Sequence, residues 1–578
     1  MRRLSLSLAF ALISSLLLAQ HSTHDPINTH AEHGAHCGGM IGWVPKEILE
    51  KPIAVKPGVG QLSDPVTTKS PEAQALYNQG VAYLHSYVWI EAARSFHQAL
   101  RHDPKLAMAH IGLARTYLNL DNQAEARAQV AKAQALAEGI SPREQRRIEI
   151  MARQLDAISA PRDREKLLAY RSFLDQALTD FPKDPEIWTL RGNAEEATAY
   201  GRGQRGGVRS IAFYHGALAV EPKHWGANHY LIHSYEYIGQ VEDALKHGLI
   251  YVNAAPSIPH AHHMYGHDLR RVGRTDEAIE RFLRADALER AYYRDEQIDA
   301  KYDWHHTHNL SLLATAYQYQ GKLKLTEEML LKATATPGIS EYAEFFHKDY
   351  AEYLVNRRRY PEALEAARKL TQSKYALARS VGHVLAGNAL LGINPKDMKA
   401  AEAELASAEA QAKLAGDRGF VQPYIEALRA ELLLREGKQA EASRIFKDVQ
   451  RTIRAIPGPD AWMQAIYRLE LIARIARENG DWELAEYTAK QMLDHDPHYG
   501  GSQFAMGLVE EHKGNHAAAR QWMAKAKAAW AAADPGFLDP KLEELKEAAV
   551  PAPAAPAKTD TSTLTPVREM KFDPRMMV

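Results

Sequence analysis

The chain has 578 residues with 71 basic and 72 acidic side chains. This balance gives no charge excess that would direct the protein to nucleic acid or to an anionic membrane. The one cysteine, Cys37, excludes an internal disulfide framework, so stability must come from packing. Histidine is the exceptional residue type, with 27 copies, eleven of them between His224 and His308.

Residues 1–20 have the features of a secretory signal peptide. Arg2 and Arg3 precede an apolar run that ends at Leu18, and the small residue Ala19 follows it. The run is too short for a membrane span, and we expect no span in the rest of the chain. The sequence therefore predicts an exported protein, either periplasmic or extracellular.

Residues 21–69 read as a polar leader followed by an extended arm. The leader, 21–40, is rich in histidine and contains Cys37, so we expect a mobile segment, with loose metal binding as the alternative. Prolines and glycines in 41–69 favour an extended arm. At the other end, the Ala/Pro-rich residues 550–578 predict a disordered tail.

A 34-residue pattern begins after residue 70. With Ala73 as position 1, positions 4, 8, 11, 20, 24, 27 and 32 hold Leu76, Gly80, Tyr83, Ala92, Phe96, Ala99 and Pro104. This pattern resembles the helix-turn-helix signature of the tetratricopeptide repeat (TPR) family. In such a unit, small residues at positions 8 and 20 let helices A and B approach closely, and the aromatic residues fill the remaining space. We therefore predict an all-α TPR superhelical solenoid.

The repeats divide the predicted solenoid into three parts. N-terminal units cover 70–200, central units cover 201–340, and C-terminal units cover 341–549. In the central part, two units start in strict register at Trp225 and Pro259. Extra residues follow at 293–306, and the next frame starts at Thr307.

The central histidines fall at equivalent positions of consecutive A helices. One pair takes positions 5 and 9 of the first helix, with a glutamate at position 12, and a second pair takes positions 5 and 9 of the next. Two further histidines occupy position 2 of the second and third helices. Residues four apart share one face of a helix. The set is His229, His233, Glu236, His260, His263, His267 and His308.

The TPR resemblance implies that positions 2, 5, 9 and 12 of helix A line a concave groove. Adjacent helices pack roughly 10 Å apart, so imidazoles from both can reach one ion at about 2 Å. We therefore predict a metal site with one or two transition metal ions. Neutral imidazole suits zinc, copper or iron, and a single carboxylate does not favour calcium.

Further residues near this set are candidates for substrate contacts. Arg270 occupies position 12, in phase with the second histidine pair, and can hold an anion. Tyrosines here are either hydrogen-bond partners of a substrate or packing residues. The candidates are Tyr230, Tyr235, Tyr265, Arg270 and Asn309. The histidines whose phase points elsewhere are His224, His247, His262, His305 and His306.

Beyond the repeat, three motifs resemble a subgroup of exported bacterial TPR proteins with no assigned reaction. They read His229-Tyr230-x-Ile232-His233-x-x-Glu236, then His260-x-x-His263-Met264-x-x-His267-x-x-x-Arg271-x-Gly273-Arg274, then His308-Asn309. Where the subgroup usually has proline after Met264, this chain has Tyr265. The resemblance implies that these residues form one site, and it carries no mechanism.

Two functions from different classes fit the sequence. The first is an exported TPR protein with a metal site, acting as a metal-dependent oxidoreductase or hydrolase. The second is a non-catalytic TPR scaffold that binds a peptide or partner protein in the same groove. No serine elbow, phosphate loop, CxxC pair or dinucleotide fingerprint indicates another catalytic class. Whether the protein is an enzyme stays open at this stage.

Overall fold

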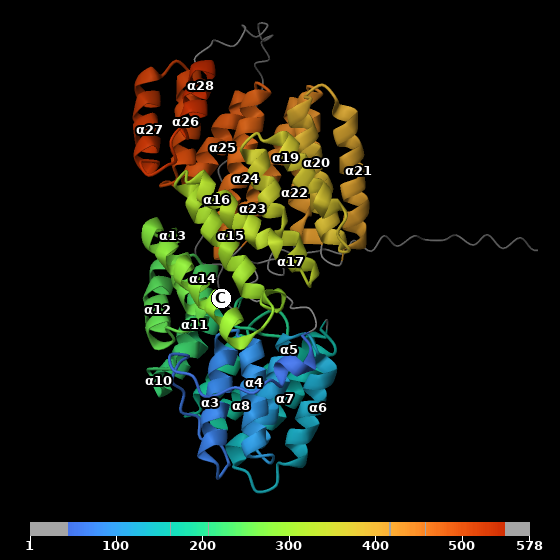
Figure 1. The fold of residues 1–578 in the computed structure, drawn as a ribbon, viewed down its shortest axis with the longest axis vertical. Helices are drawn as coiled ribbons and strands as arrows, with labels where there is room; N and C mark the ends of the chain where they lie inside the picture. The colour runs from blue at the N-terminus through green and yellow to red at the C-terminus, as the bar shows by residue number, and fades with distance from the viewer. Residues whose placement is uncertain (1–43, 162, 206, 416–417, 457, 549–578) are drawn as a thin grey trace, which may run out of the picture.

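The computed structural model describes residues 44–161, 163–205, 207–415, 418–456 and 458–548. The expected signal peptide, leader and tail lie outside these ranges. Within them the chain is built of helices and contains no strand, which confirms the all-α prediction. Figure 1 shows the N-terminal helices in blue at one end, the central helices in green, and the C-terminal helices in orange and red at the other end.

The N-terminal part begins with the arm, which contains one short helix and is otherwise irregular up to Ser70. Ser70 caps the next helix by accepting from the Ala73 amide, and Pro71 occupies its first turn. Ser141 and Glu144 form a capping box further on. The helices are α2 (Lys46–Leu49), α3 (Pro71–His85), α4 (Trp89–His102), α5 (Ala107–Asn119), α6 (Gln123–Ala135), α7 (Pro142–Ile158), α8 (Arg164–Asp180) and α9 (Pro185–Asn193).

The central part supplies the predicted site. It comprises α10 (Gly207–Val220), α11 (Trp225–Tyr237), α12 (Val241–Ala254), α13 (Pro259–Arg271), α14 (Thr275–Glu296), the 3-10 turn η1 (Ala300–Tyr302), α15 (Trp304–Tyr319) and α16 (Leu323–Ala335). The extra residues at 293–306 therefore lengthen α14, form η1 and start α15 three residues before the predicted Thr307.

The C-terminal part continues the array of antiparallel pairs. Its helices are α17 (Glu341–Phe346), α18 (Lys348–Asn356), α19 (Tyr360–Thr371), α20 (Ala376–Ile393), α21 (Met398–Leu414), η2 (Arg418–Phe420), α22 (Gln422–Arg435), α23 (Gln439–Ala455), α24 (Pro459–Glu478), α25 (Trp482–His495), α26 (Gly500–His512), α27 (His516–Ala529) and α28 (Asp539–Ala548).

The contacts within hairpins follow the TPR positions. A Cβ on Gly80, at position 8, would lie 2.5 Å from the ring of Phe96 at position 24. Gly266 and Phe282 repeat this relationship in a central unit, with a distance of 2.7 Å. Both aromatic rings are fully buried. The small residues thus do what the sequence pattern predicts, and the solenoid of TPR-type hairpins is confirmed by its own packing.

Glycines turn the chain at the end of each central A helix. Gly239, Gly273 and Gly321 have φ values of 78°, 81° and 75°, a region that other residues seldom adopt. Each one precedes a B helix that returns against its own A helix. This common turn keeps α11, α13 and α15 in constant phase.

The array encloses its central A helices instead of leaving them along an open groove. Helix α3 packs against α11, and α24 packs against both α13 and α15. Tyr251 on α12 donates to Ser86 in the α3–α4 turn at 2.9 Å. The expectation that the histidines line an open concave surface is therefore not met, because N-terminal and C-terminal units cover them.

One helix of the described chain, α20, is long and apolar enough to cross a membrane by length and composition. The sequence alone predicts no such stretch. Sixty-one per cent of its apolar window is buried inside the fold, as in the core helix of a soluble protein. This helix does not decide whether the protein has a membrane span.

Candidate metal centre

The structure brings all seven predicted ligands together. Helix α11 carries His229, His233 and Glu236, helix α13 carries His260, His263 and His267, and helix α15 carries His308. Except for the half-buried His308, each of these side chains is at most 5% exposed. The six imidazoles divide into two groups of three.

The first triad consists of His229, His233 and His260. The Nε2 atom of His229 lies 3.0 Å from Nε2 of His260 and 3.1 Å from Nε2 of His233. Three nitrogens around one ion at about 2.0–2.1 Å would be separated by about 3.3 Å. These two Nε2 separations are thus close to those around a bound ion, and ligand atoms of all three rings lie within 4.8 Å of one another.

A backbone carbonyl fixes the tautomer of His229. Its Nδ1 lies 2.5 Å from the carbonyl oxygen of His85, and because a carbonyl only accepts, Nδ1 must donate its proton there. The lone pair is then left on Nε2, which faces the other two rings. An outer oxygen that orients an imidazole in this way is typical of metal-binding histidines.

The second triad consists of His263, His267 and His308, with one ligand atom of each ring lying within 4.8 Å of the others. His263 repeats the arrangement of His229, since its Nδ1 donates to Oδ1 of Asn309 at 3.0 Å. Its Nε2 is buried and has no hydrogen-bond partner in the described part of the chain. The two position-5 histidines therefore both present Nε2 to their triads.

Glu236 connects the two triads. Its Oε2 lies 3.9 Å from Nδ1 of His233, and its Oε1 lies 3.8 Å from Nδ1 of His267. Beside it, burial and the neighbouring charge of Glu236 raise the pKa of Asp268 well above its usual range. The raised pKa favours the protonated carboxyl of Asp268, which is the form that can donate a hydrogen bond to Glu236.

Burial keeps the imidazoles neutral, which is the form that binds metals. It lowers the pKa of His233 to about 3. Burial and the adjacent rings also lower the pKa of His229, His260, His263 and His267 well below the ordinary value. Five lone pairs are thus available at neutral pH without any proton having to leave.

The two triads are neighbours. The ring centroids of His260 and His263 are 5.8 Å apart. Trp304 spans the pair, with its ring 5.8 Å from His260 in the first triad and 5.9 Å from His308 in the second. The arrangement suits two ions held side by side.

Two features near the triads escaped the sequence analysis. Tyr87 packs its ring 4.6 Å from His229 and 5.3 Å from His260, and it is held at φ 57°, a strained value for tyrosine. His305 was assigned away from the site, yet its ring lies 5.0 Å from His260 and 4.6 Å from His263. The three-residue separation of His305 and His308 was the available signal.

A third cluster, His85, Glu186 and His224, has a different character. Glu186 Oε1 accepts from His85 at 2.6 Å and from His224 at 3.2 Å, while its Oε2 accepts from Arg115 at 3.1 Å. Because this carboxylate already has charged and polar partners, the cluster is a hydrogen-bonded support. It positions His85, whose carbonyl orients His229.

The remaining predicted contacts are placed as follows. Asn309 joins the site as the acceptor for His263. Tyr230 donates to His85 Nδ1 at 2.9 Å, behind the first triad, because Nε2 of His85 carries the proton that it donates to Glu186. Tyr235 pairs with His215 at 2.9 Å, away from the triads. Tyr265 is buried near Arg281.

Arg270 is not available to a substrate. Its guanidinium donates to Asp496 at 3.2 Å and lies 3.5 Å from the ring centroid of Tyr319. The pairing with Asp496 disfavours the predicted role as an anion holder, and a C-terminal helix pair packs against this face of α13. All five histidines assigned elsewhere lie outside the triads. His305 contacts triad rings, whereas the other four bond to other partners: His224, His247, His262 and His306.

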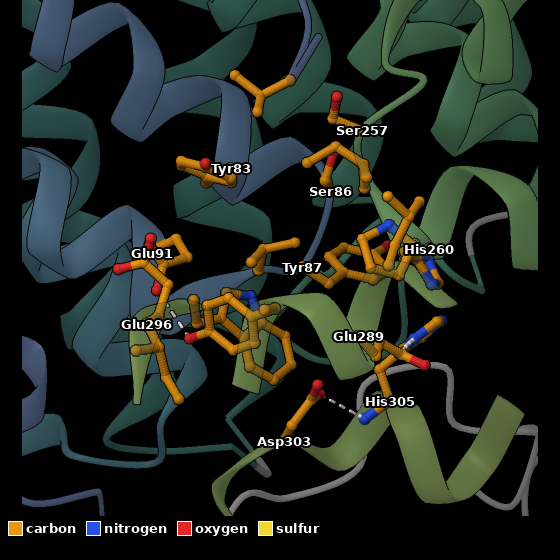
Figure 2. Close-up of a pocket in the computed structure, with 18 of the residues that line it drawn as sticks. Tyr83, Ser86, Tyr87, Glu91, Ser257, His260, Glu289, Glu296, Asp303 and His305 are labelled. Carbon is orange, nitrogen blue, oxygen red and sulfur yellow. Dashed lines mark hydrogen bonds and ion pairs between the residues drawn. The ribbon is translucent and has the colours of Figure 1, made fainter. Parts of the chain in front are cut away.

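A cavity of about 370 Å³ adjoins the triads. His260 and His305 belong to its wall, together with side chains from the α3–α4 turn and the segment between α14 and α15. Figure 2 shows His260, Glu289 and His305 at one side of it, Tyr83, Glu91 and Glu296 at the other, and Tyr87 between them.

No protein-family model and no curated protein matches the chain. Among solved structures, yeast Tom70 overlaps with a TM-score of 0.36 at 12% identity, over 72% of this chain and 91% of that one. The human IFIT1 dimer with PPP-AAAA gives 0.33 at 14% identity, over 81% and 92%. The Cut9–Hcn1 hetero-tetramer gives 0.32 at 12%, over 82% and 76%. Scores this low carry no weight for fold or function.

Proposed function

We propose that the protein is an exported TPR-type protein that binds two transition metal ions, one in each histidine triad, and uses them in catalysis. The observation that carries the proposal is the repeated orientation of His229 and His263. In each, an outer oxygen accepts a hydrogen bond from Nδ1, so the lone pair is on Nε2, and the ring lies among two other imidazoles. Buried lone pairs that face one another are costly unless something pairs with them.

The ligand chemistry supports zinc, copper or iron. Six imidazoles are the donors, and imidazole nitrogen suits these metals and does not suit calcium or magnesium. Three nitrogen ligands also leave a coordination position open, as in catalytic metal sites. When bound, ions of this kind supply Lewis-acid or redox chemistry.

The cavity next to His260 supports a catalytic role over a purely structural one. A structural metal site is closed, whereas this one has space for a small molecule on the side of the first triad. A metal-dependent oxidoreductase and a metal-dependent hydrolase both fit this arrangement. Export rests on the signal-like residues 1–20, and N-terminal sequencing of protein recovered outside the cytoplasm tests it.

The proposed metal content is tested by elemental analysis of the purified full-length chain. We expect two ions per chain in the native protein, about one in His229→Ala, about one in His263→Ala, and none in the double variant. His247→Ala is the matched control, because His247 is a half-buried histidine of the same region that hydrogen-bonds Asn228 and belongs to neither triad. Native protein that stays metal-free after incubation with zinc, copper and iron would contradict the proposal.

The scaffold function predicted as the alternative has weaker support. The histidines of both triads are buried, apart from the half-buried His308, so they cannot serve as a contact surface for a peptide in an open groove. A partner protein that binds native chain and the double variant with equal affinity would place partner binding on another surface.

A further inference from the structure

The cavity beside the first triad is enclosed by segments that are distant in sequence. The arm contributes Lys56 and Val59, the α3–α4 turn contributes Tyr87 and Trp89, and the start of α15 contributes Trp304. The backbone of the arm is tied to the α12–α13 turn, since Ser257 N donates to the carbonyl oxygen of Gly58 at 2.8 Å. The cavity is thus a formed part of the fold, and its volume lies within the range of small-molecule sites.

Aromatic side chains make up much of its wall. Tyr83, Tyr87, Trp89, Tyr292, Tyr302 and Trp304 all line it. The rings of Trp89 and Trp304 are close, with centroids 6.0 Å apart. Flat apolar faces of this kind favour a flat apolar ligand, because ring–ring contacts add to the burial of apolar surface.

The charged groups of the wall do not favour an anionic ligand. Glu91 accepts from Arg94 at 2.7 Å and from Tyr292 at 2.7 Å. Glu296 accepts from Arg94 at 2.7 Å and also binds Lys56, which is the one cation among the lining residues. With carboxylates in excess and its lysine already paired, the side chains of the wall offer no cation to a carboxylate or phosphate.

The end of the cavity nearest the triads is polar. Glu289 binds Nδ1 of His305 through Oε1. Its Oε2 and the Nε2 of His305 are buried, and in the described part of the chain neither has a hydrogen-bond partner. Whichever of the two groups carries the proton they share, Oε2 remains an acceptor. A hydroxyl group, which both donates and accepts, can satisfy either state of the pair.

From these observations we propose that the cavity binds a small neutral aromatic alcohol, a molecule with one or two rings and a hydroxyl group. Its rings lie among Tyr87, Trp89 and Trp304, and its hydroxyl group lies at the end formed by His260, Glu289 and His305. The binding of this ligand class stands on the cavity alone. Its role as substrate of the metal centre rests on the proposed function.

The test uses 2-naphthol as the probe and measures its binding to the full-length chain by calorimetry, with metal content determined on the same preparations. Naphthalene lacks the hydroxyl group, and 2-naphthoate replaces it with an anionic group. We expect one 2-naphthol per chain, with at least tenfold weaker binding of both comparison compounds. Equal or tighter binding of 2-naphthoate overturns the proposal.

Two leucines on α14 give a matched pair of variants. Leu288 lines the cavity, whereas Leu283 is 41% exposed and does not. Leu288→Trp fills the cavity and should weaken 2-naphthol binding at least tenfold while metal content is retained. Leu283→Trp should leave both unchanged. Binding that is insensitive to Leu288→Trp places the probe elsewhere and overturns the proposal.

Glu289→Leu tests the polar end, because leucine has a similar size and no acceptor. In this variant the ratio of the affinity for 2-naphthol to the affinity for naphthalene should fall toward one, provided that its circular dichroism spectrum matches that of the native chain. The experiments distinguish failure of the proposed ligand class from failure of the proposed metal centre. Metal-loaded protein that does not bind 2-naphthol overturns the ligand class alone, and metal-free protein that binds it in the Leu288-dependent manner overturns the metal centre alone.

Discussion

The imidazole of His229 donates its Nδ1 proton to the backbone carbonyl of His85, which lies 144 positions earlier in the chain, at 2.5 Å. This one bond ties the first repeat unit to the proposed metal centre in the central units. It also decides which nitrogen of His229 is available as a ligand. His263 obtains the same orientation from a side chain, Asn309, and that difference can be tested by mutation.

Asn309→Leu should weaken the binding of one ion and leave the other unchanged. Leucine removes the acceptor for His263 Nδ1, and loss of such an outer-shell partner typically costs about 10–100-fold in metal affinity. Titration of metal-free protein with zinc, read as two affinities, measures the effect. Asn309→Asp keeps an acceptor oxygen and should restore most of the affinity. A leucine variant with two native affinities would show that Asn309 does not orient His263.

Glu236→Gln should weaken both ions together, again by about 10–100-fold each. Its two carboxylate oxygens face His233 in one triad and His267 in the other, so removing the charge affects both sets of ligands. The same zinc titration applies, and Asn309→Leu serves as the single-site comparison. An effect confined to one ion would mean that the carboxylate serves one triad only.

Removal of the metal should lower the thermal stability of the native chain. Ions that bind the folded state stabilise it by about 4 kcal/mol when the free metal is at about a thousand times Kd. We therefore expect the melting temperature to fall by several degrees in a chelator. The double variant His229→Ala/His263→Ala is the control and should show no change with chelator. If neither metal nor chelator changes the melting temperature of the native chain, the chain does not bind metal specifically.

The repeat period allowed the site to be predicted from the sequence. The enclosure of the site by the N-terminal and C-terminal units could not be predicted in this way. Because the hairpins stack in constant phase, position numbers alone brought His229, His233, His263 and His267 together. Tyr87 could not be found in this way, since it reaches the triad only through the packing of α3 against α11. Arg270 has the correct phase, but Asp496, from 226 positions away, takes its guanidinium.

Acid should destabilise the metal-free chain between about pH 6.5 and pH 4. Burial lowers the pKa of His97 to about 4, and of His495 likewise to about 4. In this window the unfolded chain binds more protons than the folded chain, so the free energy of unfolding falls as pH falls. Between pH 6.5 and pH 5 each such histidine contributes on the order of 2 kcal/mol at most.

Urea unfolding of metal-free protein at pH 7.5 and pH 5 measures this loss. His97→Gln should reduce the difference between the two pH values, because glutamine does not titrate. His102→Gln, at an exposed position on the same helix α4, is the control and should leave the difference unchanged. Equal pH dependence in the native chain and His97→Gln would show that His97 does not contribute.

Two glycines at the same TPR position should respond oppositely to alanine. In Gly266→Ala the new Cβ would lie 2.7 Å from the ring of Phe282, and overpacking of a buried contact typically costs about 1–3 kcal/mol. In Gly507→Ala the nearest atoms, in Met523 and Trp522, are 3.5 Å away. There alanine fits and should stabilise the helix by up to about 1 kcal/mol.

Urea unfolding of the two variants at neutral pH gives the comparison, and Gly266→Ala/Phe282→Leu tests its cause. Leucine in place of the phenylalanine ring makes room for the new methyl group, so the double variant should lose less than the sum of the two single changes. Because α13 carries three of the six triad histidines, Gly266→Ala should also weaken metal binding, whereas Gly507→Ala should not. Equal destabilisation by both alanines would mean that the ring at position 24 does not set the spacing between helices A and B.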